Sequence, residues 1–270
     1  MRARKRFGQH FLHDPAVIER IVSAIEPRAA DHLVEIGAGR GALTRALLAR
    51  NTASLDAVEV DRDLAQSLQA ELAGTPSFTL HRADALEFDF AALSAARGAR
   101  LRLVGNLPYN ISTPLLFHLL ASAAALRDMH VMLQREVAAR ITALPGGAEY
   151  GRLTVMLAPW IRAQRLFDVG PGAFQPAPRV WSAMLRLEVL REPAFAVSPR
   201  YAAIVAAAFS HRRKTLRNAL KGFVSAAEIE ACGLNPGARP ETLPAAAYNA
   251  RACAAETATA QASPAGQRMG

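Results

Sequence analysis

The strongest constraint on the fold is a regular alternation of short apolar runs with segments of helical periodicity. Strand-like runs occupy residues 32–36, 55–60, 78–81, 101–104 and 129–133. Between them apolar residues recur every three or four positions, as in Leu64, Leu68 and Leu72, which predicts amphipathic helices. A further helix is predicted before the first strand, with Asp14 as its N-cap and Pro15 as its first residue. This order is typical of an α/β fold with a doubly wound, mostly parallel sheet.

The later part of the chain follows a different pattern. Residues 163–169 and 182–190 are strand-like, and only the Gly/Pro-rich residues 170–178 join them, which predicts an antiparallel hairpin at the sheet edge. Short helices are then predicted at residues 201–209, 214–223 and 226–232. The sequence therefore predicts a large domain over residues 1–190, a small helical domain over 191–253, and a disordered tail over 254–270.

Charge and composition favour a protein that binds an acidic partner, and they argue against a membrane-spanning, secreted or disulfide-rich one. The chain carries 32 Lys and Arg against 23 Asp and Glu, a net charge of +9, which favours an acidic partner such as nucleic acid. Residues 191–270 hold ten basic and five acidic side chains, so the small domain is the more basic one. No apolar run approaches the roughly 18–20 residues of a membrane span, and no secretory signal is evident. Two cysteines, Cys232 and Cys253, make neither a disulfide framework nor a metal site, so we expect a cytoplasmic protein without a metal.

Three motifs follow successive predicted strands, where ligands bind in such sheets. They are the loop Gly37-Ala38-Gly39-Arg40-Gly41, then Glu59, and then Asp84. Glu59 could accept hydrogen bonds from two ribose hydroxyls, and Asp84 could accept one from the exocyclic amine of an adenine. Taken singly, they could be a tight turn, a charge at a helix start and an N-cap. Together they indicate a nucleoside cofactor. The spacing G-x-G-x-G differs from the G-x-G-x-x-G typical of dinucleotide binding, and the missing phosphate-binding chemistry favours S-adenosylmethionine over NAD.

A fourth motif, Asn106-Leu107-Pro108-Tyr109, follows the fourth predicted strand. The exocyclic nitrogen of adenine is a poor nucleophile because its lone pair is delocalised into the ring. The Asn106 side-chain oxygen and the Leu107 carbonyl could accept its two N–H groups and turn the lone pair toward a methyl donor. Pro108 would fix the turn, and Tyr109 would offer a face for stacking the base. The simpler interpretation is a proline turn after a strand.

These motifs resemble the rRNA adenine N6,N6-dimethyltransferases of the KsgA/RsmA type, which act on small-subunit rRNA. The resemblance covers about residues 4–220 and rests on seven segments in order: Lys5 to Leu12, Val34 to Gly37, Glu59 to Asp61, Asp84-Ala85, Gly105 to Pro114, Phe174 to Val180 and Phe209 to Asn218. It implies a class I methyltransferase fold with a small helical C-terminal domain.

The resemblance also implies roles for individual residues. It places Asn106, Leu107, Pro108, Tyr109 and Phe174 at the reacting adenine, with Phe174 opposite Tyr109. It implies cofactor contacts by Gln9, His10, Leu12, Gly37, Gly39, Glu59, Asp84 and Asn106. Without the family, Phe174 is better interpreted as an anchor in the core. Two positions depart from the family pattern: His10 stands where some members have Asn, and Trp181 where many have an acidic residue.

A basic segment in the small domain indicates RNA binding. Arg213, Arg217 and Lys221 recur at i, i+4 and i+8, with Arg212 and Lys214 alongside, which predicts a phosphate-binding stripe on one helix. The alternative is an ordinary solvated helix face.

The functional prediction is an S-adenosylmethionine-dependent enzyme that dimethylates two adjacent adenosines near the 3′ end of small-subunit (16S) rRNA. Its expected partner is this rRNA within a pre-30S or 30S particle, and we expect a monomer. One alternative is a relative that dimethylates large-subunit rRNA and confers antibiotic resistance. The other is a ribosome-assembly or transcription factor that keeps the fold and the RNA binding but not the catalysis.

Overall fold

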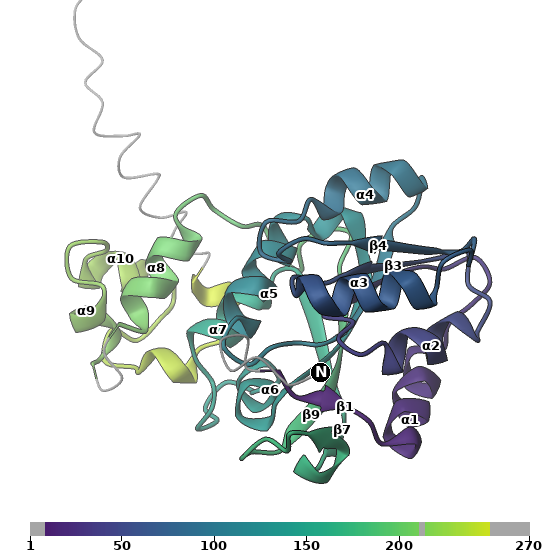
Figure 1. Cartoon of the computed structure of the whole chain (residues 1–270). Coiled ribbons are helices and arrows are strands. Elements are labelled where there is room, and N and C mark those ends of the chain that lie inside the picture. The colour runs from purple at the N-terminus through teal and green to yellow at the C-terminus, as the bar shows by residue number, and fades with distance from the viewer. Residues whose placement is uncertain (1–8, 211–213, 249–270) are drawn as a thin grey trace, which may run out of the picture. The chain divides into compact units, whose positions relative to one another are not determined.

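The computed structural model describes residues 9–210 and 214–248, which form two compact units (Figure 1). Within these residues, the first unit comprises 9–138 and 161–191, and the second comprises 139–160, 192–210 and 214–248. Residues 139–160, which the sequence assigned to the large domain, thus belong to the C-terminal unit. The reason is packing, because Tyr150 and Val155 are buried in that unit's core. The predicted tail, residues 254–270, lies outside the described residues.

The first unit is built on a seven-stranded sheet with the order β4-β3-β2-β5-β6-β9-β7. Its parallel strands are β2 (His32–Ile36), β3 (Ser54–Val58), β4 (Phe78–His81), β5 (Leu101–Asn106) and β6 (Leu126–Gln134). The strands β9 (Ser182–Val189) and β7 (Ile161–Val169) run antiparallel at one edge. This confirms the predicted doubly wound sheet and its antiparallel edge.

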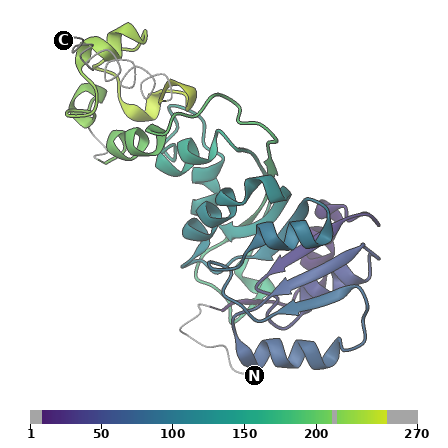
Figure 2. The ribbon, with the colours of Figure 1, turned by 90° about the horizontal axis from the view of Figure 1, so that it is seen from above.

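Helices cover both faces of this sheet (Figure 2). One apolar core joins α1 (Pro15–Ile25), α2 (Ala42–Leu48) and α3 (Arg62–Glu71) to sheet residues such as Leu33 and Leu55. The unit also contains α4 (Phe90–Arg97), α5 (Ser112–Ala121) and the start of α6 (Arg135–Ile141). Asp14 caps α1 as predicted, because its carboxylate accepts the N–H groups of Ala16 and Val17.

A second, two-stranded sheet was not predicted. The strands β1 (Phe11–Leu12) and β8 (Phe174–Gln175) pair antiparallel, with Leu12 opposite Phe174. This pairing fixes the start of the described chain beside the loop that connects β7 to β9, and it brings His10 to the edge of the large sheet where the parallel strands end.

The second unit is helical. It contains α7 (Arg152–Leu157), α8 (Tyr201–Ala208), α9 (Leu216–Ala219), α10 (Ala226–Ala231) and the 3-10 turn η4 (Pro240–Thr242). Tyr201, Ile204, Leu216 and Tyr248 lie in its core. Among the described residues of both units, no helix has the length and apolar character needed to cross a membrane.

The predicted helix over residues 214–223 is wrong in length. Helix α9 begins after its N-cap Thr215 and ends at Ala219, and Gly222 then adopts φ +89°, a left-handed conformation that suits glycine. Lys214 therefore precedes the helix and Lys221 follows it, so the cations do not form an i, i+4, i+8 stripe on one helix. Arg212 and Arg213 lie outside the described residues.

Candidate active site

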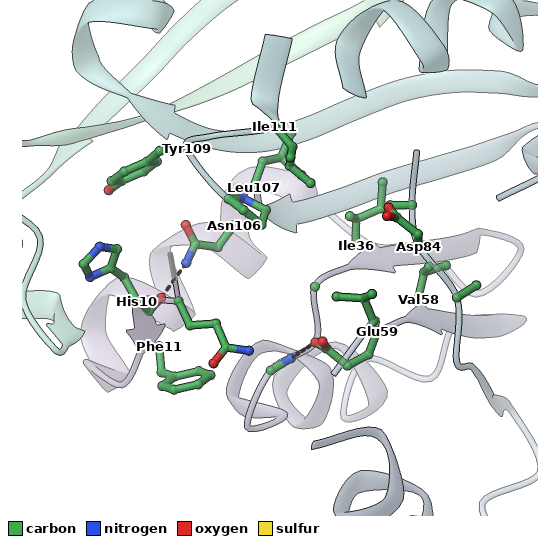
Figure 3. A pocket seen from close by; sticks show the side chains of 17 residues that line it. His10, Phe11, Ile36, Val58, Glu59, Asp84, Asn106, Leu107, Tyr109 and Ile111 are labelled. Atoms are coloured by element: carbon green, nitrogen blue, oxygen red, sulfur yellow. Dashed lines mark hydrogen bonds between the residues drawn. The ribbon is translucent and has the colours of Figure 1, made fainter. Parts of the chain in front are cut away.

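A cavity opens where the parallel strands β2, β3 and β5 end (Figure 3). The structure brings most of the predicted site residues to its wall: Gln9, His10, Gly37, Gly39, Glu59, Asp84, Asn106, Leu107, Pro108 and Tyr109. Leu12 lines a second cavity, which shares His10, Phe11, Gly37, Gly39 and Asn106 with the first. The carboxyl edge of the sheet thus carries one continuous candidate site, as the strand-end motifs predicted.

Glu59 ties the glycine loop to the sheet. One carboxylate oxygen accepts the N–H of Gly39 at 2.9 Å, and the other accepts the N–H of Asp61 at 2.8 Å. Burial raises the pKa of the Glu59 carboxyl, and these backbone hydrogen bonds oppose that effect. Since two carboxylate oxygens offer about four acceptor positions, both can still accept hydroxyl protons from a ligand.

The loop itself needs its glycines. Gly37 and Gly39 have φ values of +74° and +57°, which side chains with a Cβ rarely adopt. A Cβ on Gly39 would also lie only 3.2 Å from the ring of Phe11. The chain can therefore turn closely around the cavity while the Gly39 N–H points at Glu59.

Asp84 lies at the same end of the cavity as Glu59 (Figure 3). One of its oxygens accepts the N–H of Leu86 at 2.9 Å, so Asp84 closes a turn and does not cap α4, whose N-cap is Asp89. Among the described residues that line this first cavity, two are carboxylates and none is Lys or Arg. Such a wall suits a neutral or cationic ligand better than a pyrophosphate.

Glu35 is a candidate site residue to which the sequence reasoning gave no role, although it lies within the segment Val34 to Gly37, two positions before the glycine loop. It is buried beside the second cavity, and its Oε2 has no hydrogen-bond partner among the described residues. Burial raises the pKa of its carboxyl to about 7, with Glu59 adding to the rise and Thr44 opposing it. Residue spacing alone does not predict that this carboxyl is buried beside the cavity.

Asn106 is held in a defined orientation. Its Nδ2 donates to the backbone carbonyl of His10 at 3.0 Å (Figure 3). Because a carbonyl can only accept, the amide nitrogen must face His10, and the side-chain oxygen is therefore turned away from it. The N–H of Leu107 donates to the carbonyl of Met132 at 3.1 Å, which fixes the following turn against β6.

Tyr109 and His10 lie beside Asn106, at the other end of the cavity from Asp84 (Figure 3). The hydroxyl groups of Tyr109 and Ser182 are hydrogen-bonded at 2.7 Å, and burial raises the pKa of the Tyr109 phenol. The His10 and Tyr109 ring centroids are 5.7 Å apart. His10 Nδ1 donates to the carbonyl of Pro176 at 2.8 Å. Tyr109 is thus an aromatic wall anchored at its hydroxyl end.

Comparison with known proteins identifies the family. A model of the family described as ribosomal RNA adenine dimethylase matches residues 1–253. The chain belongs to this family. A protein of Pseudomonas fluorescens named ribosomal RNA small subunit methyltransferase A is 54% identical over 252 residues, which cover 92% of each chain. A relative of the same name from Pseudomonas aeruginosa is 52% identical over 249 residues, again 92% of each chain.

The fold of this chain is also similar to solved structures of methyltransferases. A dimethyladenosine transferase from Plasmodium falciparum matches with a TM-score of 0.77 at 21% identity, over 90% of this chain and 96% of that one. The 23S rRNA methyltransferase ErmE matches with a TM-score of 0.69 at 26% identity, over 91% and 99%. The predicted class I methyltransferase fold is confirmed.

The structure does not bring every predicted residue of this dimethylase to the cavity. Phe174 is only 3% exposed, belongs to the apolar core and lines neither cavity, as the alternative interpretation of a core anchor describes. Lys214, Arg217 and Lys221 are exposed on the second unit.

Proposed function

We propose that this protein transfers methyl groups from S-adenosylmethionine to the N6 atoms of two adjacent adenosines near the 3′ end of small-subunit rRNA. The observation that carries the proposal is the orientation of Asn106. Its amide nitrogen donates to the His10 carbonyl, which turns the side-chain oxygen away from His10 and leaves this oxygen able to accept a hydrogen bond from a ligand in the cavity. An acceptor at this place is what an adenine amine needs in order to react.

The residues of the cavity fit S-adenosylmethionine. The cofactor supplies a methyl group bonded to a positively charged sulfur, and its nucleoside carries ribose hydroxyls and an adenine amine. Glu59 would accept from the ribose and Asp84 from the amine, while Gly37 and Gly39 would let the backbone approach. When ionised, the buried Glu35 adds negative charge beside the glycine loop, which favours a cationic ligand.

Around the substrate, the residues act by positioning. The Asn106 oxygen and the Leu107 carbonyl would each accept one N6–H bond, so that the nitrogen lone pair points out of the ring plane. Tyr109 would hold the flipped base by stacking against its face. Methyl transfer forms the N–C bond as the S–C bond breaks, and the displaced N6 proton leaves to solvent. The rate gain would come from orientation and fixed polar groups.

The small subunit is the better supported substrate. The relatives named for the small subunit are 52–54% identical to this chain, whereas ErmE, named for 23S rRNA, is 26% identical. An intact Asn106 to Tyr109 turn and the acidic cavity argue against a non-catalytic assembly factor. We propose a cytoplasmic monomer that acts on rRNA within a pre-30S or 30S particle, without a metal.

The test is methyl transfer from labelled cofactor to undermethylated 30S particles, with 50S particles and naked 16S and 23S rRNA in parallel. We expect label in 30S particles, located as N6,N6-dimethyladenosine near the 3′ end. Label only in 50S particles or in 23S rRNA would show that the large-subunit alternative holds. Cofactor binding without transfer to any of the four would favour the assembly factor.

A further inference from the structure

Trp181 is exposed on the surface of the first unit. Its exposed fraction is 48%, and that of the preceding Val180 is 43%. An indole is the largest apolar side chain, so exposing it forfeits much of the free energy that its burial would contribute. Tryptophan is enriched at binding interfaces, where its ring provides a large contact surface.

The backbone of Trp181 is hydrogen-bonded to the end of the sheet, and its indole packs against neighbouring residues. The Arg135 N–H donates to the Trp181 carbonyl at 2.9 Å, directly beyond the β6–β9 pair Gln134 and Ser182. A Cβ on Gly170 would lie 3.6 Å from the indole Cη2, so the six-membered ring packs beside that glycine. The Arg135 guanidinium carbon is 6.0 Å from the ring centroid. An aromatic surface that is already ordered loses little entropy when a ligand stacks on it.

Trp181 lies at the same edge of the sheet as the reacting turn. Asn106 pairs with Met132 on β6, and Gln134, two residues further, pairs with Ser182 on β9. From strand spacing and rise, the backbones of Asn106 and Trp181 are roughly 10–15 Å apart. The adjoining Ser182 hydroxyl holds the Tyr109 hydroxyl. A nucleotide near the one in the cavity could therefore reach the indole.

The surrounding charge matches RNA. Arg135 and Arg179 are both exposed, and neither takes part in an ion pair among the described residues. A nucleotide of single-stranded RNA offers a base to stack on an aromatic ring and a phosphate to pair with a cation. We propose that Trp181, Arg135 and Arg179 form a stacking subsite for an unpaired base that flanks the target adenosine. This inference rests on the proposed function.

Tryptophan fluorescence tests this directly, because the chain contains only Trp160 and Trp181. In the W160F variant, Trp181 is the sole indole. An adenylate decamer should quench its emission in a saturable manner, and an abasic decamer of the same length should not. By a binding assay without fluorescence, W181A should bind the adenylate decamer roughly 5- to 150-fold more weakly, as expected for the loss of one stacked base. W181F should restore most of that loss.

Cofactor affinity and melting temperature should be the same in W181A and the native protein. An unchanged affinity of W181A for the adenylate decamer, or equal quenching by both decamers, would overturn the subsite. A concentration-dependent dimer that W181A abolishes would also overturn it, because the indole would then meet a second copy of the chain. The native enzyme's activity on 30S particles reports separately on the proposed function, so the two can fail independently.

Discussion

The Asn106 amide and the His10 backbone carbonyl form a hydrogen bond of 3.0 Å between residues 96 positions apart in the sequence. The β1–β8 pairing holds the chain that carries His10, and β5 ends at Asn106. The amide is therefore oriented before a substrate binds. Preorganised polar groups of this kind contribute more to catalysis than groups that must reorient during the reaction.

Replacing Asn106 should abolish most turnover. In N106A the adenine amine loses its acceptor, and we expect a fall in turnover of at least about 10²-fold. N106D keeps the shape but cannot donate to the His10 carbonyl, and it should be impaired as well. The measurement is the single-turnover rate of methyl transfer to undermethylated 30S particles, with melting temperature as the control for folding. A rate for N106A within a few-fold of the native enzyme would remove Asn106 from its assigned role.

Replacing Glu59 should weaken cofactor binding through two losses. E59A would remove the proposed acceptor for ribose hydroxyls, and it removes the acceptor of the Gly39 N–H in the glycine loop. Since hydrogen bonds to charged groups contribute about 1.5–3 kcal/mol each, we expect the Kd to rise by about tenfold or more. Calorimetry without RNA measures this. The matched control is E71A, because Glu71 is paired with Arg45 on the surface and does not line the cavity. Equal cofactor affinities for E59A and E71A would contradict the assignment.

The buried Glu35 makes stability depend on pH. Its pKa is about 7 in the folded protein against an ordinary 4.5, so the native state holds this proton more tightly than the unfolded state. Below about pH 4.5 the Glu35 carboxyl is protonated in both states and does not lower the free energy of unfolding. As the pH rises from about 4.5 to 7 it lowers this free energy progressively. Above pH 7 the decrease is constant at about 3 kcal/mol.

The variant E35Q should thus raise the melting temperature at pH 8 and match the native protein near pH 4. Melting curves across this range test the expectation, with E71Q as an exposed control. A gain for E35Q that is the same at pH 4 and pH 8 would show that Glu35 does not titrate in this window. At pH 8, where Glu35 is ionised, calorimetry should show weaker cofactor binding in E35Q, because the charge beside the glycine loop is lost.

Particular elements show how far the sequence could predict the structure. The strand over residues 78–81 has the bounds that its apolar pattern predicts, because Phe78 and Leu80 alternate with polar residues and pack on the core. The β1 and β8 strands have two residues each, and their paired residues Leu12 and Phe174 are 162 positions apart in the sequence, so no periodicity reveals them. The spacing of the basic residues alone could not show that α9 ends at Ala219.

The candidate site was also predictable only in part. Because Glu59, Asp84 and Asn106 lie at the ends of predicted parallel strands, the sequence placed them in one site, and all three line the same cavity. The sequence did not predict that Glu59 would bind the Gly39 N–H. For Phe174 the residues alone favoured the core anchor that the structure shows, whereas the resemblance implied a place at the reacting adenine. Which atom a side chain meets depends on contacts between distant segments, and these leave no trace in local residue spacing.

The cations around α9 still permit a test of RNA binding on the second unit. Lys214, Arg217 and Lys221 are exposed, and none is ion-paired among the described residues. Removing a cation that binds a phosphate should reduce the salt dependence of 30S binding by about 0.7–0.9 in the logarithmic slope. The triple Ala variant should therefore bind 30S particles more weakly at low salt and with a shallower slope, at an unchanged cofactor affinity.

The control for this triple variant removes the same charge from the first unit, at the exposed side chains of Arg50, Arg62 and Arg162. If net charge alone attracts the particle, both variants lose affinity to the same extent. If the α9 cations touch phosphates, only their removal changes the slope, because counterion release depends on the phosphates that are neutralised and not on total charge. Parallel salt titrations with equal intercepts for the native protein and the α9 variant would place RNA binding on another surface. The stacking subsite at Trp181, whose test is independent of salt slope, would then be the first place to look.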